Sequence, residues 1–111
     1  MSSLGEIGAF TLANRGAFIC ELQAKYLDNS GHWQFTKNIS WKIAYSQDCT
    51  MTMTELGVPN GAQVQLYVLI DAGTNRGVTE IFTANTQSNL IAGYIVDRTS
   101  LNANVQFQGI E

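Results

Sequence analysis

Residues 17 to 27, AFICELQAKYL, alternate apolar and polar side chains over the length of a strand. The apolar side carries Phe18, Cys20, Leu22, Ala24 and Tyr26, and the polar side carries Glu21, Gln23 and Lys25. A period of two predicts a strand with one buried face. Because DNSG at 28 to 31 is dense in turn formers, we expect HWQFT at 32 to 36 to return as its hairpin partner.

The same period continues along most of the chain. The most apolar segment, QVQLYVLIDAG at 63 to 73, has Tyr67 and Leu69 on its second side as well, so we expect a central strand that is covered to some extent on both faces. Further strands are predicted within SWKIAYS (40–46), CTMTMTE (49–55), VTEIFTA (78–84), LIAGYIV (90–96) and LNANVQFQ (101–108). About eight or nine short strands predict an all-β protein, a single-domain antiparallel β-sandwich over residues 1–111. No helix is expected.

The composition excludes some classes of function. Charged residues make up 14% of the chain and the net charge is −3, so there is no basic stripe to bind a nucleic acid backbone. The N-terminal MSSLGEIGAF lacks the pattern of a secretion signal, and no segment reaches the roughly 20 apolar residues of a membrane-spanning helix. We therefore expect a soluble protein, either cytoplasmic in the producing cell or released without a leader.

Catalytic chemistry is poorly represented. His32 is the single histidine and lies beside the DNSG turn, where a solvated loop residue is expected. Cys20 and Cys49 fall on the apolar sides of their strands, which predicts inert buried thiols and leaves open whether they pair. An enzyme needs a nucleophile, a base and an orienting group within reach. The sequence therefore predicts a non-enzymatic protein without a cofactor.

Three carboxylates could approach one another at one rim of the sheet. Asp71 and Asp97 each end an apolar strand, and Glu80 lies in the segment between them. Two interpretations stay open: a weak metal or ligand site, or solvated acids at strand ends, of which the second is favoured.

Binding chemistry is better represented. Amide and hydroxyl groups match the hydroxyls of sugars, and aromatic rings can stack on a sugar or hold a choline headgroup. The predicted ligand-binding residues are Trp33, His32, Asn29, Gln34, Tyr45 and Trp41. Trp33 leads this set because it follows a polar turn, with packing at one end of the core as its alternative. Trp41 is read more readily as a core residue.

The sequence contains two rows of neutral polar side chains, one of threonines and one of amides. Thr50, Thr52 and Thr54 fit either a flat ligand-binding face or, as favoured, the solvent side of an ordinary strand. The last strand presents four amides on one side, namely Asn102, Asn104, Gln106 and Gln108. Edge strands usually carry a charge that discourages pairing. If this strand is an edge, it predicts a homo-oligomer.

The order GVPNGAQVQLYV, TNRGVTEIFTA and IAGYIVDRTSLNANVQF, with its terminal Leu-Asn-x-x-Val-x-Phe, resembles the closing strands of actinoporin-like β-sandwich proteins. This class includes lectins and membrane-active cytolysins. The resemblance implies a sandwich fold and aromatic residues that hold sugars or lipid headgroups. Its pore-forming members have an amphipathic N-terminal helix, which MSSLGEIGAF does not match, so the resemblance does not extend to pore formation.

Three functional hypotheses follow. The leading one is a lectin-like module that recognises a glycan or a similar polar surface ligand, as a component of a defence or toxin system. The alternatives are a membrane-active toxin that docks on lipid headgroups and a self-assembling structural subunit.

Overall fold

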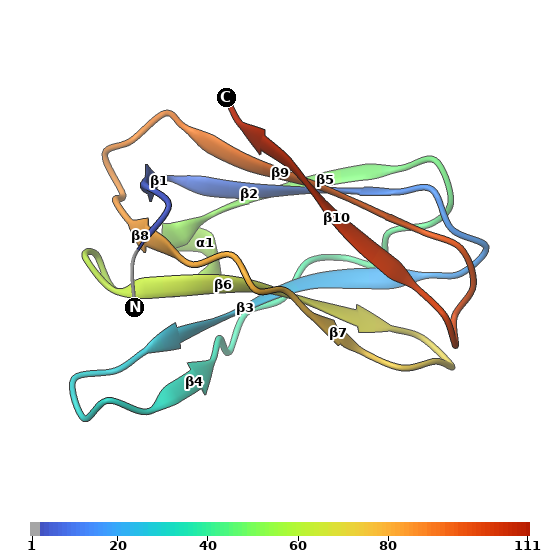
Figure 1. The fold of residues 1–111 in the computed structure, drawn as a ribbon, viewed down its shortest axis with the longest axis horizontal. Coiled ribbons are helices and arrows are strands. Elements are labelled where there is room, and N and C mark those ends of the chain that lie inside the picture. The colour runs from blue at the N-terminus through green and yellow to red at the C-terminus, as the bar shows by residue number, and fades with distance from the viewer. Residues whose placement is uncertain (1–2) are drawn as a thin grey trace.

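The computed structural model describes residues 3–111, which form two stacked β-sheets with one short helix (Figure 1). In the first sheet, hereafter sheet A, the strand order is β1 (Glu6–Ile7), β8 (Phe82–Ala84), β6 (Gln63–Ile70), β3 (Cys20–Leu27) and β4 (Trp33–Phe35), with β7 (Arg76–Gly77) also paired to β6. In sheet B the order is β10 (Asn104–Ile110), β9 (Ile91–Asp97), β2 (Ala9–Asn14) and β5 (Asp48–Thr52). The all-β sandwich expected from the sequence is confirmed.

The prediction of a purely antiparallel sandwich is wrong. β2 and β9 run parallel from Ala9↔Ile91 to Asn14↔Val96, and the short β1 pairs in parallel with β8. The described residues contain ten strands rather than eight or nine. The direction of pairing could not be predicted from the sequence, because side-chain periodicity is the same in parallel and antiparallel strands. Only the path of the connections decides which strands become neighbours.

The core lies between the sheets. The alternation of β3 is confirmed, since Cys20, Leu22 and Ala24 are fully buried. The expected hairpin of β3 and β4 is present, and β6 lies in the middle of sheet A with Tyr67 and Leu69 half-buried on its outer side. From sheet B, the ring of Tyr94 packs against those of Phe10 and Phe107 at centroid distances of 6.1 and 5.2 Å.

The CTMTMTE segment changes structure halfway. β5 buries Cys49 and Met51 and exposes Thr50 and Thr52, as expected for the wet side of a strand. The strand then ends, and α1 (Met53–Leu56) begins where we predicted more strand. Thr52 is the N-cap: its hydroxyl accepts from the Glu55 backbone N–H, and the Glu55 carboxylate accepts from the Thr52 N–H. Thr-x-x-Glu is the capping-box pattern that the alternation concealed.

Three other expectations are corrected by the packing. SWKIAYS is not a strand: Ile43 alone forms a bridge, to Cys20, while Trp41 and Tyr45 are exposed. VTEIFTA contributes only Phe82–Ala84 as strand. Leu101, expected to face the core, has 65% of its surface exposed because it lies in the turn before β10.

Candidate functional site

Residues 36–43 cover the free side of β3 beyond the short β4, and they do so through three anchor residues. Thr36, Ser40 and Ile43 are buried, and their backbone N–H groups donate to the carbonyls of Ala24, Leu22 and Cys20 respectively. The anchors are four and three residues apart, so the covering chain is irregular. Between the anchors, residues 37–39 and 41–42 are exposed.

Two of these anchors use a side chain in place of a backbone carbonyl. The Ser40 hydroxyl accepts from the Leu22 N–H at 2.8 Å, and the Thr36 hydroxyl accepts from the Ala24 N–H at 3.3 Å. A buried N–H without an acceptor would be costly, and an irregular chain cannot place its own carbonyls at the strand spacing. The short hydroxyls therefore complete the edge of β3.

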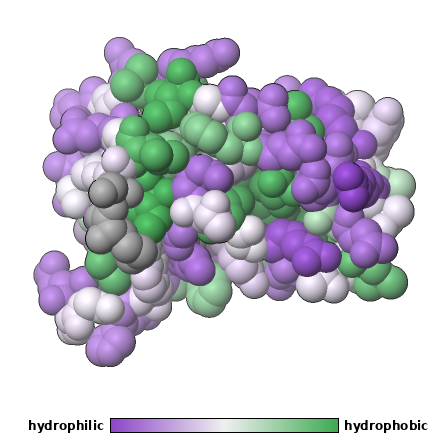
Figure 2. Space-filling model, in the orientation of Figure 1, coloured by the Kyte–Doolittle hydropathy of each residue, from purple (hydrophilic) through white to green (hydrophobic). Residues whose placement is uncertain are grey.

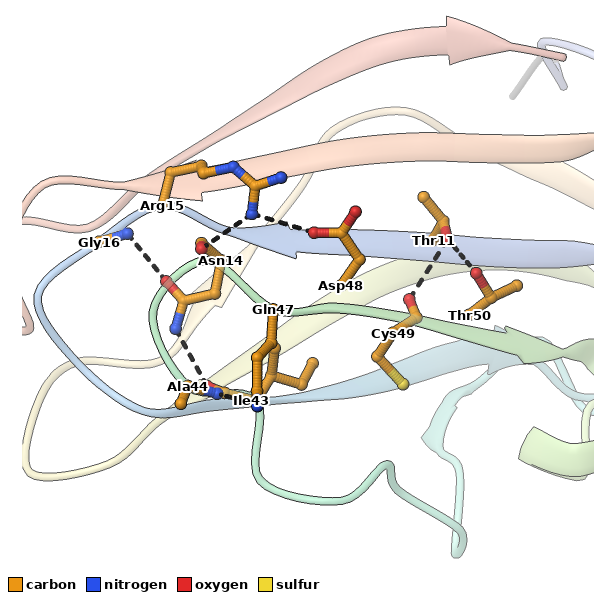
Figure 3. A network of polar contacts seen from close by, with 10 residues as sticks. All are labelled: Thr11, Asn14, Arg15, Gly16, Ile43, Ala44, Gln47, Asp48, Cys49 and Thr50. Carbon is orange, nitrogen blue, oxygen red and sulfur yellow. Dashed lines mark hydrogen bonds and ion pairs between the residues drawn. The ribbon is translucent and has the colours of Figure 1, made fainter.

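The far end of the covering chain is fixed by Asn14, which is fully buried (Figure 3). Its amide nitrogen donates to the carbonyls of Ile43 at 3.0 Å and Phe18 at 2.8 Å, and its amide oxygen accepts from the Gly16 N–H. Nearby, Arg15 forms an ion pair with Asp48 at 2.9 Å. The exposed residues between the anchors thus lie on a hydrogen-bonded support.

We call residues 33–45 the edge segment. Large apolar side chains stand out along it: the exposed fractions are 55% for Phe35, 41% for Ile39, 60% for Trp41 and 65% for Tyr45. Both tryptophans of the chain lie in this segment, since Trp33 is its first residue. Trp33 is half-buried, with the Lys25 ammonium 5.9 Å from its ring centroid.

The edge segment is also locally basic. It contains Lys37 and Lys42, no acidic residue, and thus two of the three lysines of a chain whose net charge is −3. Lys42 pairs with Asp71 at 2.8 Å and Glu21 at 3.6 Å, and the hydrogen bond to Asp71 raises the pKa of Lys42. Lys37 is exposed.

The β3–β4 turn is organised by Asp28. Its carboxylate accepts from the backbone N–H groups of His32 and Ser30 and from the Gln34 amide, each at 2.9 Å. The bond from the His32 N–H, followed by that from Gln34, lowers the pKa of Asp28. His32 and Asn29 are exposed on this turn.

A hollow of about 510 Å³ opens between this turn and the loop before β6. Tyr26, Leu27, Asp28 and Asn29 line one side, and residues 59–63 line the other. Tyr26 pairs with Gln34, and Trp33 pairs with Leu27. Trp33 therefore shares a face of the sheet with Leu27, but Trp33 itself is not among the residues that line the hollow.

The predicted site residues therefore separate into two places. Asn29 and His32 belong to the turn, and Gln34, in β4 at the start of the edge segment, donates to Asp28 of that turn; of these three only Asn29 lines the hollow. Trp41 and Tyr45 lie on the edge segment, together with Trp33 at its start. Sequence reasoning missed Phe35 and Ile39 as exposed apolar residues, and it missed Thr36 and Ser40 as anchors. The sequence contained no direct signal for these anchors, because the burial of Thr36 and Ser40 depends on the position of the chain beside β3.

The thiols are placed as expected. Cys20 and Cys49 are free and buried. Burial, reinforced by the negative charges of Asp71 and Glu21, raises the pKa of the Cys20 thiol to about 12, and burial also raises that of Cys49. Because the thiolate is the reactive form, neither group is activated as a nucleophile.

The predicted rim carboxylates do not form a metal site. Asp71 pairs with Lys42, and Glu80 accepts from the Tyr94 hydroxyl at 2.9 Å. Within residues 3–111 no three His, Cys, Asp or Glu side chains come together as ligands for a metal ion. The same residues include no helix of sufficient length and apolar character to cross a membrane.

Comparison with known proteins gives a likeness of fold. No protein-family model and no curated protein matches the sequence. Among solved structures, intermedilysin in a disulfide-locked form with human CD59 matches with a TM-score of 0.51 and 13% identity, over 94% of this chain and 24% of that one. A structure described as a trapped toxin matches with a TM-score of 0.50 and 14% identity, over 91% of this chain and 23% of that one.

A third structure, the membrane-binding domain of pneumolysin, has a TM-score of 0.46 and 13% identity, over 92% of this chain and 96% of that one. The present chain thus spans about a quarter of the length of the first two proteins. These likenesses confirm the all-β fold that the resemblance to actinoporin-like proteins implied.

Proposed function

We propose that this protein docks on a membrane surface through the edge segment, as the binding module of a toxin-type protein, and that it acts without catalysis. The observation that carries the proposal is the exposure of Phe35, Ile39, Trp41 and Tyr45 on one acid-free segment. The fold that it shares with a structure described as a trapped toxin is consistent with this function.

The side chains of the edge segment suit the boundary between water and lipid. Tryptophan and tyrosine are enriched there because one end of each ring is apolar and the other hydrogen-bonds. Burying a large apolar side chain contributes about 1.5–3 kcal/mol, so Trp41 and Phe35 together support weak, reversible binding to a bilayer. Lys37 adds about 1 kcal/mol near an anionic surface, with its stem lying along the lipid.

The support beneath the edge segment favours docking without refolding. The anchors at Ser40 and Ile43 keep Trp41 between two fixed points. A side chain already held outward loses less conformational entropy when it binds than one in a mobile loop. We therefore expect docking to leave the β-sheets unchanged.

Vesicle binding tests this function directly. Because both tryptophans lie in the edge segment, their emission should shift to shorter wavelength when phosphatidylcholine vesicles are added, and the protein should sediment with the vesicles. Trp41→Ser should weaken binding about tenfold, from the loss of one partly inserted ring. Leu101→Ser is the matched control, since Leu101 is 65% exposed but lies in the β9–β10 connection, and should bind as wild type.

Unchanged emission and no sedimentation with vesicles, whether neutral or enriched in phosphatidylserine, would refute the docking function. Equal losses in Trp41→Ser and Leu101→Ser would show that binding does not involve the edge segment.

A second candidate function, recognition of a soluble glycan, is favoured by the hollow beside the β3–β4 turn. The Tyr26 ring and hydroxyl and the amides of Asn29 and Asn60 offer the flat and hydrogen-bonding surfaces that a sugar needs. In a glycan array, binding that is lost in Asn29→Ala and kept in Trp41→Ser would support this function. An array without any bound glycan would dismiss it and leave membrane docking intact.

A further inference from the structure

β10 is the long, open edge of the sandwich. It is the outermost strand of sheet B, and within residues 3–111 it pairs with β9 alone. It has seven residues, whereas the other outermost strands, β1, β4 and β5, have two, three and five. Proteins usually keep such edges short or charged, because unpaired N–H and C=O groups accept another strand.

The side chains of β10 do nothing to prevent pairing. From Leu101 to Ile110 the chain contains no charged residue and no proline. Asn104, Gln106 and Gln108 lie on the outer side, with Gln106 and Gln108 exposed. Amide side chains donate and accept at once, so they can bond to identical amides on a second strand.

The inner side of β10 is incompletely covered. Val105 and Phe107 face the core and are half-buried, although the Phe107 ring lies 5.6 Å from that of Phe82. Figure 2 shows hydrophobic colour gathered over the area of β8 and the C-terminal half of β10. Leu101, at the other end of the strand, is 65% exposed. The edge thus combines free backbone groups with apolar surface.

We propose that β10 is the self-association surface of this protein, where it pairs antiparallel with β10 of a second copy. The two four-stranded B sheets would then form one continuous sheet across a twofold axis. An axis at Gln106 sets the two Gln106 amides opposite each other on the outer face. On the inner face it sets Val105 opposite Phe107 of the partner subunit, which covers both half-buried side chains.

The same geometry limits the strength of the dimer. The register of β10 shifts at Gln108, between Phe107 and Gly109, and a bulge of this kind bends and twists an edge. Regular pairing is therefore confined to the residues next to the axis, from Val105 to Phe107. So short a ladder buries less surface than the roughly 1,200 Å² of a standard stable interface, so the dimer should depend on concentration.

Sedimentation velocity over a wide concentration range tests the pairing. The wild-type protein should shift from monomer to dimer as its concentration rises. Gln106→Lys should remain monomeric, because the twofold axis would oppose two ammonium groups. Thr54→Lys is the control, since Thr54 is exposed on α1 at the other side of the sandwich, and should dimerise as wild type.

A charge-swap experiment separates pairing from misfolding. Gln106→Glu alone should also be monomeric, but an equal mixture of Gln106→Lys and Gln106→Glu should form a heterodimer, since opposite charges now meet at the axis. A wild-type monomer at every concentration, a dimer of Gln106→Lys, or no association in the mixture would each overturn the proposal.

Discussion

Two edges of this sandwich, beside β3 and at β10, treat their unpaired backbone groups in opposite ways. On the side of β3 the chain continues past β4 and covers the edge through Thr36, Ser40 and Ile43. On the side of β10 the edge stays open over seven residues. At the covered edge, the backbone N–H and C=O groups are hydrogen-bonded within the molecule and side chains project outward. At the open edge, the backbone N–H and C=O groups are themselves available to pair with another strand. The first arrangement suits a surface ligand, and the second suits another strand.

The covered edge and the open edge should differ in their sensitivity to substitution. The covering chain needs a buried apolar residue and buried hydroxyls, each of which is sensitive to substitution. At the open edge, the outer side chains of Gln106 and Gln108 are exposed. They can therefore be replaced with little effect on the stability of the monomer. The following predictions test this difference, from the largest expected effect to the smallest.

Removing the apolar anchor should open the covered edge. Ile43→Ala should lower the free energy of unfolding by about 2–5 kcal/mol, because it leaves a cavity beneath the irregular chain. Thermal or urea unfolding measures this. Ile39→Ala, at a 41% exposed position of the same segment, should change stability by less than about 0.5 kcal/mol. Similar losses in both variants would contradict the anchoring role of Ile43.

Removing a hydroxyl anchor should have a smaller effect. Ser40→Ala should cost about 1–3 kcal/mol, because the buried Leu22 N–H loses its side-chain acceptor. Hydrogen exchange should show faster exchange at the Leu22 amide. Ser30→Ala, in the exposed β3–β4 turn, is the control and should behave as wild type. An unchanged Leu22 exchange rate would mean that another group, such as water, satisfies this N–H.

Alkaline pH should reveal the burial of the thiol next to the covered edge. The folded state holds the Cys20 proton up to a pKa of about 12, whereas an unfolded thiol releases it near its ordinary value of 9.0. The unfolded state then binds fewer protons, so stability should fall as pH rises above about 9, by up to about 1.4 kcal/mol per pH unit.

Chemical unfolding of wild type and Cys20→Ala between about pH 8 and pH 10 measures this slope. Cys20→Ala should be less stable at neutral pH, from the loss of packing, but flatter in its pH dependence. Equal slopes in the two proteins would show that the Cys20 thiol is not the group responsible.

The smallest effect is expected at the open edge. Gln106→Ala should alter the unfolding free energy of the dilute protein by less than about 0.5 kcal/mol, because the Gln106 side chain is exposed. Urea unfolding at low protein concentration measures this. A loss above about 1 kcal/mol would mean that the outer side of β10 contributes to the monomer, which would remove the contrast between the edges.

Much of the fold could be predicted because a strand that is buried on one side has alternating apolar and polar residues in its sequence. Cys20, Leu22 and Ala24 alternate with polar residues and are buried, and the DNSG turn returns the chain as expected. Trp33 and Trp41 were recognised as candidates for binding from their type and surroundings. That both lie on the edge segment, away from Asn29 and the hollow, could not be predicted, because it depends on where residues 36–43 run beside β3.

The sequence by itself determined the two-layer β class, the burial of both thiols and the neutral polar character of β10, since each depends on residue type and a period of two. The tertiary structure alone decided that β2 and β9 run parallel, that Trp41 and Tyr45 point outward and that β10 is an open edge. These properties depend on which distant segments become neighbours. Ser40 illustrates the reason: its hydroxyl becomes an anchor only because the backbone of Leu22 lies opposite it.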